Sequence, residues 1–269
     1  SIVVAGDSNT VAINSDYSTI VGGQNNIVST SSVYTTIVGG TANNVSNTYA
    51  TIVGGSGNAA SGLSSFVGAG QSNTASGSQS SVVAGIGNTA SGLGSGVPSG
   101  TYNTASGDYS VAQGNNATAN RHSLRSYASY NLTGAVSRPQ VENQLVLIQT
   151  TTSTSAILTT NGAVAGASNR ITIANDSSYA FHGIITARRA DADNESAMWE
   201  IKGGIDNNAG TTALVGCPSI ITLGDDSSGV WTVTVDADDT NDALQISVVG
   251  QNTKTINWAC ALTLMKVTG

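Results

Sequence analysis

A glycine recurs at nearly constant spacing through the first 119 residues, and this repeat restricts the possible folds more than any other feature. The spacing between successive glycines is 17, 17, 15, 15, 15, 15 and 14 residues. In the first seven copies a β-branched residue lies three positions before the glycine and an asparagine three positions after it. Self-similarity of this period is typical of a solenoid in which each copy forms one coil. The glycines are Gly6, Gly23, Gly40, Gly55, Gly70, Gly85, Gly100 and Gly114.

Each copy reads as a short strand followed by a bend, because β-branched residues favour strands and glycine permits positive φ. A copy holds few apolar side chains, each worth about 1.5–3 kcal/mol when buried. Ordering its backbone costs about 1–2 kcal/mol per residue. A single coil therefore needs neighbours above and below. We expect a narrow column of stacked coils, supported by identical columns from other chains, with asparagines bonded along a ladder.

The pattern Val-x-x-Gly-x-x-Asn-x-Ala-Ser-Gly resembles the head repeat of trimeric autotransporter adhesins (YadA-like heads), which also occurs in phage tail fibres. That resemblance implies a left-handed parallel β-roll that forms a homotrimer. The chain departs from the usual 14-residue spacing in its first copies, for which we expect loops on one side. Ala117 replaces the asparagine of the eighth copy.

Charge is scarce and unevenly distributed. Before Arg121 the only charged residues are Asp7, Asp16 and Asp108, and the net charge of the chain is −7. An acidic chain without a basic stripe argues against a nucleic-acid partner. No apolar run is long enough to span a bilayer, so no membrane insertion is expected. Because the sequence starts inside a repeat without Met, we interpret it as a fragment or a processed protein.

The second half contains short apolar runs separated by turn residues, without helical periodicity. This pattern predicts an all-β chain with an antiparallel sandwich or jelly-roll-like domain after the parallel roll. We expect domains at 1–119 (roll), 120–143 (neck) and 144–269 (sandwich). In the neck, Arg121, Arg125 and Arg138 either pair with a neighbouring chain or are solvated. The predicted strands are 145–150, 156–160, 170–175, 179–189, 196–204, 212–216, 219–224, 230–236, 243–250 and 254–267.

Several segments of this half, including YAFHGIITARR (179–189) and VWTVTVDADD (230–239), resemble the C-terminal domain of phage tail fibre and related virion proteins. In that family the domain is a trimeric β-structured tip or collar. The resemblance therefore agrees with that of the repeat in implying a trimeric protein on the outside of a particle or cell.

The sequence offers no evident catalytic group. Polysaccharide cleavage uses two carboxylates on one face, and no two aspartates of the roll occupy matching positions of adjacent coils. No catalytic triad, phosphate-binding loop or Cys/His metal set occurs, so we predict no enzyme and no cofactor. Asp236, Asp238 and Asp242 alternate as calcium ligands do. However, the Gly and the terminal Glu of an EF-hand are missing, so a hairpin turn is favoured over a metal site.

Aromatic residues supply the candidate binding site. By alternation, Trp199, Trp231 and Trp258 should face a core. In contrast, Tyr17, Tyr34 and Tyr49 occupy one position of successive coils and should form a column of rings. The column either packs against the neighbouring coil or chain, or stacks on sugars.

The two cysteines favour no compartment. Cys217 and Cys260 lie in apolar surroundings, where two buried free thiols are favoured over a mutual disulfide.

These observations favour a homotrimeric phage tail fibre fragment in the virion. It would attach non-covalently to a host cell-surface glycan or protein receptor and contact other tail proteins. Two alternatives remain open. One is the head of a bacterial trimeric autotransporter on the bacterial outer surface. The other is a polysaccharide-degrading tailspike.

Overall fold

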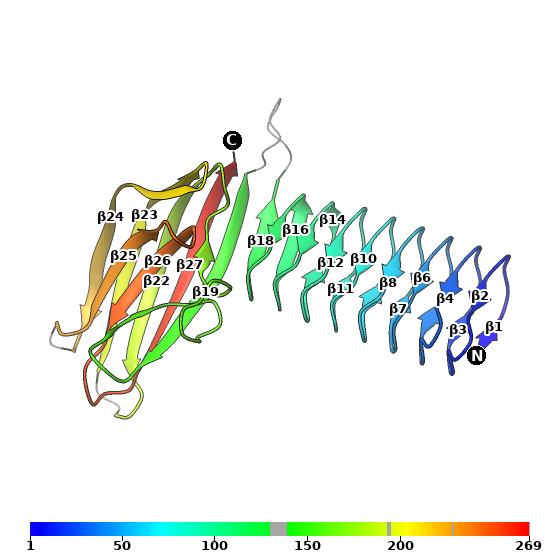
Figure 1. The fold of residues 1–269 in the computed structure, drawn as a ribbon, viewed down its shortest axis with the longest axis horizontal. Coiled ribbons are helices and arrows are strands. Elements are labelled where there is room, and N and C mark those ends of the chain that lie inside the picture. The colour runs from blue at the N-terminus through cyan, green and yellow to red at the C-terminus, as the bar shows by residue number, and fades with distance from the viewer. Residues whose placement is uncertain (130–138, 193–194, 228, 269) are drawn as a thin grey trace. The chain divides into compact units, whose positions relative to one another are not determined.

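The computed structural model describes residues 1–129, 139–192, 195–227 and 229–268, and the described residues form strands, turns and loops without any helix. The chain divides into two compact units, Ser1–Tyr130 and Asn131–Gly269 (Figure 1). The prediction of an all-β chain is confirmed.

The first unit is a parallel β-solenoid of two ladders (Figure 1). Coil-to-coil pairing follows the repeat, since Ile2 pairs with Thr19 and Thr36 pairs with Thr51. One ladder consists of β1 (Ile2–Val3), β3 (Thr19–Ile20), β5 (Thr36–Ile37), β7 (Thr51–Ile52), β9 (Phe66–Val67), β11 (Ser81–Val82), β13 (Gly96–Val97), β16 (Val111–Asn115) and β18 (Arg125–Ala128), with β14 (Gly100–Thr101) beside β16. The other consists of β2 (Thr10–Val11), β4 (Ile27–Val28), β6 (Asn44–Val45), β8 (Ala59–Ala60), β10 (Thr74–Ala75), β12 (Thr89–Ala90), β15 (Thr104–Ala105) and β17 (Thr118–Ala119).

The repeated asparagines form the expected ladder inside the solenoid. The Asn73 amide nitrogen Nδ2 donates to the carbonyl oxygens of Ala69 (3.0 Å) and Gly85 (2.9 Å). Its Oδ1 accepts the backbone N–H of Asn88 at 3.0 Å. The same acceptor contact runs from Asn9 to Asn103, which accepts the N–H of Ala117. One side chain per coil thus satisfies buried backbone groups of the next coil.

Glycine is required where coils approach each other most closely. A Cβ atom at Gly77 would overlap the carbonyl oxygen of Gly92 in the next coil. The recurring glycine of the repeat also adopts positive φ, as at Gly55 (+89°). In the two longer copies the extra residues lie between β2 and β3 and between β4 and β5, where Ile13 is 75% exposed. The expected loops are therefore present.

The second unit contains two antiparallel sheets. The larger has the order β19 (Gln140–Thr150), β27 (Ile256–Thr268), β22 (Ser177–Arg189), β23 (Ser196–Asn208) and β24 (Thr211–Asp225). In the smaller, β26 (Ala243–Val249) pairs with β20 (Ser155–Ile157), β21 (Ile171–Thr172) and β25 (Thr232–Asp238). The predicted strands 212–216 and 219–224 are parts of the single strand β24.

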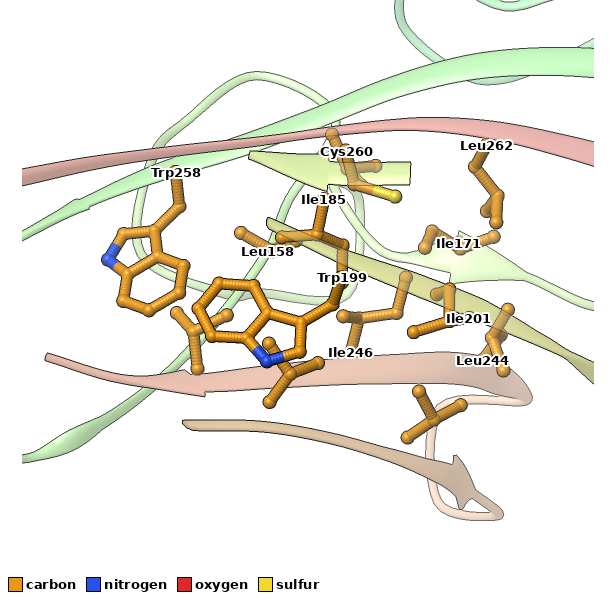
Figure 2. Close-up of a cluster of buried hydrophobic side chains, with 14 of the residues drawn as sticks. Leu158, Ile171, Ile185, Trp199, Ile201, Leu244, Ile246, Trp258, Cys260 and Leu262 are labelled. Atoms are coloured by element: carbon orange, nitrogen blue, oxygen red, sulfur yellow. The ribbon is translucent and has the colours of Figure 1, made fainter. Parts of the chain in front are cut away.

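The core of the second unit lies between these two sheets (Figure 2). Trp199 and Trp258 stack there with ring centroids 5.7 Å apart, and Trp231 lies 5.9 Å from Trp258. All three indoles are buried, which confirms the prediction that they face a core. Period-two alternation suffices for this prediction because one face of each strand meets the opposite sheet.

Parts of the expected neck, residues 120–143, belong to strands. The solenoid continues past Ala119 to β18, and β19 begins at Gln140, so structure extends into the expected neck from both sides. Arg121 is buried and Arg125 is exposed, whereas Arg138 lies outside the described residues.

Both cysteines are free, but only Cys260 is buried. The prediction of two buried thiols is wrong for Cys217, which is exposed on β24, the end strand of the large sheet.

Candidate functional site

The three predicted tyrosines form a column on the solenoid surface. Tyr17, Tyr34 and Tyr49 each adopt positive φ at the corner before a strand of the first ladder. The rings of Tyr17 and Tyr34 are 4.9 Å apart and inclined by 6°, and those of Tyr34 and Tyr49 are 5.3 Å apart and inclined by 7°. Because the rings stack on one another, the column presents mainly ring edges and hydroxyl groups to solvent. Sugar stacking uses ring faces, so this geometry favours packing within the column.

Two of the three aspartates of the predicted hairpin have partners of their own. Asp238 forms an ion pair with Arg170 at 2.6 Å. Asp242 accepts hydrogen bonds from Asn207 (3.0 Å) and Thr212 (2.9 Å). Asp236 lies on β25, which pairs with β26 across this hairpin. Within the described residues, no three His, Cys, Asp or Glu side chains form a group that could hold a metal ion.

Other carboxylates are brought together by the fold. Arg189 contacts Asp191 at 2.8 Å and Glu195 at 3.3 Å, and Lys254 binds Glu195 at 2.6 Å. The hydrogen bond from Arg189 lowers the pKa of Asp191 below its ordinary value. On the outer face of the large sheet, His182 contacts Glu200 at 3.0 Å, and this hydrogen bond lowers the pKa of Glu200.

A groove of about 640 Å³ lies in the second unit, at the end of β19. Cross-strand pairing builds it in two rows. Leu147, Ala259 and Thr186 form one row, and Gln149, Asn257 and Arg188 form the next. Residues of both rows line the groove, together with Asn161 and Gly162.

The wall of the groove is a loop fixed by its own hydrogen bonds. Gly162 lies against Leu147, where an added Cβ would meet the leucine side chain at 3.3 Å. Asn169 is buried and donates to the Asn161 side chain and to the Val164 carbonyl, each at 3.0 Å. Thr159 donates to the Ala163 carbonyl at 2.8 Å. The groove is thus formed without any need for a ligand to order it.

The chemistry of the groove suits a polyhydroxylated ligand. Gln149 donates to Asn257 at 2.8 Å, which holds two amide groups side by side in the row next to the apolar side chains of Leu147 and Ala259. Amides both donate and accept hydrogen bonds, as sugar hydroxyls do. A few convergent polar groups over an apolar floor are typical of ligand sites. Sequence reasoning missed this site because its residues come from β19, β22, β27 and a loop, and only cross-strand register joins them.

No family profile matches the chain, and no curated protein matches it. Among solved structures, the chain is similar to the tailspike protein gp49 of Acinetobacter baumannii bacteriophage Fri1, a capsular polysaccharide depolymerase. The identity is 8% and the TM-score 0.25, over 91% of this chain and 46% of that one. It is also similar to the tailspikes of Acinetobacter baumannii phage AM24 (10%, TM-score 0.23, 93% and 54%) and Acinetobacter phage vB_ApiP_P1 (8%, TM-score 0.21, 93% and 55%). The chain spans about half the length of these proteins.

This comparison corrects the prediction that the chain is not an enzyme, because the Fri1 tailspike is described as a depolymerase. The prediction had rested on the sequence alone, in which no two aspartates of the roll occupy matching positions of adjacent coils. The described residues also contain no helix that is long and apolar enough to cross a membrane.

Proposed function

We propose that this chain is part of a phage tail attachment protein of the tailspike class, which binds a polysaccharide on the host cell surface and acts as a homotrimer in the virion. The observation that carries the proposal is the groove, in which the paired amides of Gln149 and Asn257 lie beside the apolar side chains of Leu147 and Ala259. The resemblance of the repeat and of the second half to phage fibre proteins supports the class of protein. The Fri1 tailspike, a capsular polysaccharide depolymerase, suggests a polysaccharide as the kind of ligand to test.

The homotrimer has its own support in the solenoid. An exposed valine follows the buried residue of the first ladder in most coils, and together these valines form a charge-free apolar column. An apolar surface of this length is typical of an interface between proteins. Light scattering on the purified chain should give three times its 26.9 kDa mass. The valines are Val4, Val21, Val38, Val53 and Val83.

The test of binding is an array of purified bacterial capsular polysaccharides probed with the full chain. Replacing Gln149 and Asn257 together by Ala should weaken binding by about tenfold or more, because each lost hydrogen bond is worth about 0.5–1.5 kcal/mol. The matched control is Asn143→Ala. Asn143 accepts a hydrogen bond from Thr263 at 3.0 Å on the same two strands, outside the groove. Equal binding by the double variant and the wild type would contradict the proposed site.

The same samples should be assayed for newly released reducing ends. If the groove substitutions abolish cleavage while the Asn143→Ala control stays active, the groove is the site of a depolymerase. If the chain binds polysaccharide without cleaving it, we assign attachment to this portion of the protein.

A further inference from the structure

A second pocket, of about 490 Å³, lies beside the groove at the end of β19. The chain leaves β19, continues through 151–154 and enters β20, and residues along this path line the pocket. Residues 164–165 and Arg170 complete the lining. Ile148 and Gln149 line both this pocket and the groove, so the two hollows are neighbours. We call the second one the Arg170 pocket.

Arg170 carries a hydrogen-bond donor that the described residues leave unused. Its Nη1 forms the ion pair with Asp238 at 2.6 Å and contacts the Gln245 side chain at 3.4 Å. Its Nε–H is buried and meets no acceptor among the described residues. A buried polar group without a partner is unfavourable, and in a native protein it requires an explanation such as a bound group. Because Arg170 lines the pocket, a ligand there is placed to supply the acceptor.

The charge balance at Arg170 favours a neutral acceptor over an anion. The side chains of Arg170 and Asp238 are 14% and 12% exposed, so the carboxylate already neutralises the guanidinium in a mostly buried pair. A carboxylate or phosphate ligand would add an uncompensated negative charge next to Asp238, which is costly away from water. The carbonyl oxygen of an amide accepts a hydrogen bond without bringing a charge.

The rest of the lining combines apolar and hydroxyl side chains. Ile148, Ala156, Ile157 and residues 164–165 are apolar. The segment 150–155 consists of threonines and serines, most of which line the pocket. Hydroxyl groups both donate to and accept from sugar hydroxyls, whereas the apolar side chains favour burial of a methyl group. The pocket therefore suits a sugar that carries a methyl group and an amide carbonyl.

We propose that the Arg170 pocket binds the acetamido group of an N-acetylated hexose. The acetamido carbonyl accepts the Arg170 Nε–H, its methyl group packs on the apolar lining, and the ring hydroxyls meet the segment 150–155. A hexose without this group offers neither the amide carbonyl nor the methyl group. The inference deepens the proposed function by naming a sugar class, and it rests on that function for the sugar being part of a host polysaccharide.

Saturation-transfer NMR on the full chain tests the pocket with single sugars. The probes are N-acetylglucosamine and N-acetylgalactosamine, and glucose and galactose are their matched controls. We expect the acetamido sugars to bind at least about tenfold more tightly than the controls, which lack both the hydrogen bond and the buried methyl group. The acetamido methyl protons should receive the strongest saturation of all ligand protons, because they pack against the apolar lining.

Three variants locate the site. Ala165→Leu fills part of the pocket, whereas Ala167→Leu makes the same change at an exposed position of the same loop that lines neither hollow. Arg170→Lys keeps a cation beside Asp238 but removes the Nε–H. Ala165→Leu and Arg170→Lys should each weaken N-acetylglucosamine binding about fivefold or more, and Ala167→Leu should leave it unchanged.

Loss of folding is recognised by tryptophan fluorescence in urea, because the buried Trp258 indole donates to Thr150 of the pocket lining at 2.9 Å. If Arg170→Lys is unfolded by this measure, Ala165→Leu and its control still test the site. Equal binding of N-acetylglucosamine and glucose to the wild-type chain would overturn the inference. Equal binding by Ala165→Leu and Ala167→Leu would overturn it as well.

Asn257→Ala separates this inference from the proposed function, because Asn257 lines the groove and not the Arg170 pocket. We expect this variant to bind N-acetylglucosamine as the wild type does. If instead Asn257→Ala loses the acetamido sugar while Arg170→Lys retains it, the acetamido site is the groove and the inference is wrong. Polysaccharide binding on the array without any acetamido preference would overturn the inference and leave the proposed function intact. Acetamido binding at Arg170 without binding of any polysaccharide would do the reverse.

Discussion

Replacing Asn73 by Ala tests whether the asparagine ladder stabilises the solenoid. The substitution removes the acceptor of the buried Asn88 N–H and the donor to the Ala69 and Gly85 carbonyls. An unsatisfied buried polar group costs about 1–3 kcal/mol. The Gly85 carbonyl keeps the Gln71 N–H as a donor, so two groups are left unsatisfied. They give a destabilisation of about 2–6 kcal/mol, which at a urea m-value of about 2 kcal/mol/M lowers the midpoint by roughly 1–3 M.

The two units can be followed separately in this experiment. All three tryptophans lie in the core of the second unit, so tryptophan fluorescence reports its unfolding. Far-UV circular dichroism also reports the unfolding of the solenoid. Asn9→Ala is the control, because Asn9 makes the same contacts at the first coil, where its bonds to Ala5 and Gly23 are exposed to solvent. Water can replace these two bonds, but the acceptor contact to the Asn26 N–H is partly buried, so we expect a cost of about 1–3 kcal/mol, below that of Asn73→Ala.

The reasoning would be refuted by one outcome in particular. If Asn73→Ala and Asn9→Ala shift the solenoid transition by the same small amount, the buried amide contacts do not contribute as the geometry implies. A shift of the tryptophan transition alone would likewise show that the substitution acts outside the ladder.

Three further predictions follow from local geometry. Gly77→Ala should destabilise the solenoid severely by forcing adjacent coils apart, whereas Gly54→Ala, where an added Cβ meets nothing within 4 Å, should be nearly neutral in urea unfolding. Asp191→Asn should reduce the loss of second-unit stability in acid. The depressed Asp191 pKa contributes stability that is present above its ordinary value of 3.8 and is lost as the pH falls through the lower folded value. The triple change of Tyr17, Tyr34 and Tyr49 to Ala should lower solenoid stability by about 1–3 kcal/mol, since each stacked pair is worth about 0.5–1.5 kcal/mol. It should leave polysaccharide binding at the groove unchanged, and Tyr127→Ala, which lies outside the column, serves as its control.

Periodicity was sufficient to predict the solenoid because the same contact is made once per coil. The spacing of Gly6, Gly23 and Gly40 predicted the pairing of β1 with β3 and of β3 with β5, and the asparagine three positions later predicted the ladder. The second unit was harder, since its register depends on distant segments. Alternation placed Trp199 and Trp258 in the core, but nothing in the sequence indicated that 212–224 would run as one exposed edge strand.

The candidate sites divide in the same way. The tyrosine column follows from the repeat, although the mutual stacking that covers the ring faces is a property of side-chain rotamers that spacing does not contain. The groove could not be predicted, because Gln149 meets Asn257 across a pairing between residues more than one hundred positions apart in the sequence. The error over Cys217 has a related cause, since an apolar strand predicts burial only when another strand or sheet covers it.

The contributions of the apolar core and of the asparagine ladder to stability should change in proportion along the solenoid. Ile37 and Val45 fill one early coil, whereas Val97 and Ala105 fill a late one, while the asparagine contacts stay the same. Ile37→Ala should cost about 2–5 kcal/mol, comparable with Asn43→Ala. Val97→Ala should cost only about 1.5 kcal/mol at about 0.8 kcal/mol per buried carbon. This cost is less than that of Asn103→Ala, which leaves the buried Ala117 N–H without its acceptor. Urea unfolding of these four variants would measure whether the core or the ladder contributes more to stability in each coil. If Val97→Ala were as costly as Asn103→Ala, the late coils would depend on their apolar core after all, and the ladder would lose the role assigned to it.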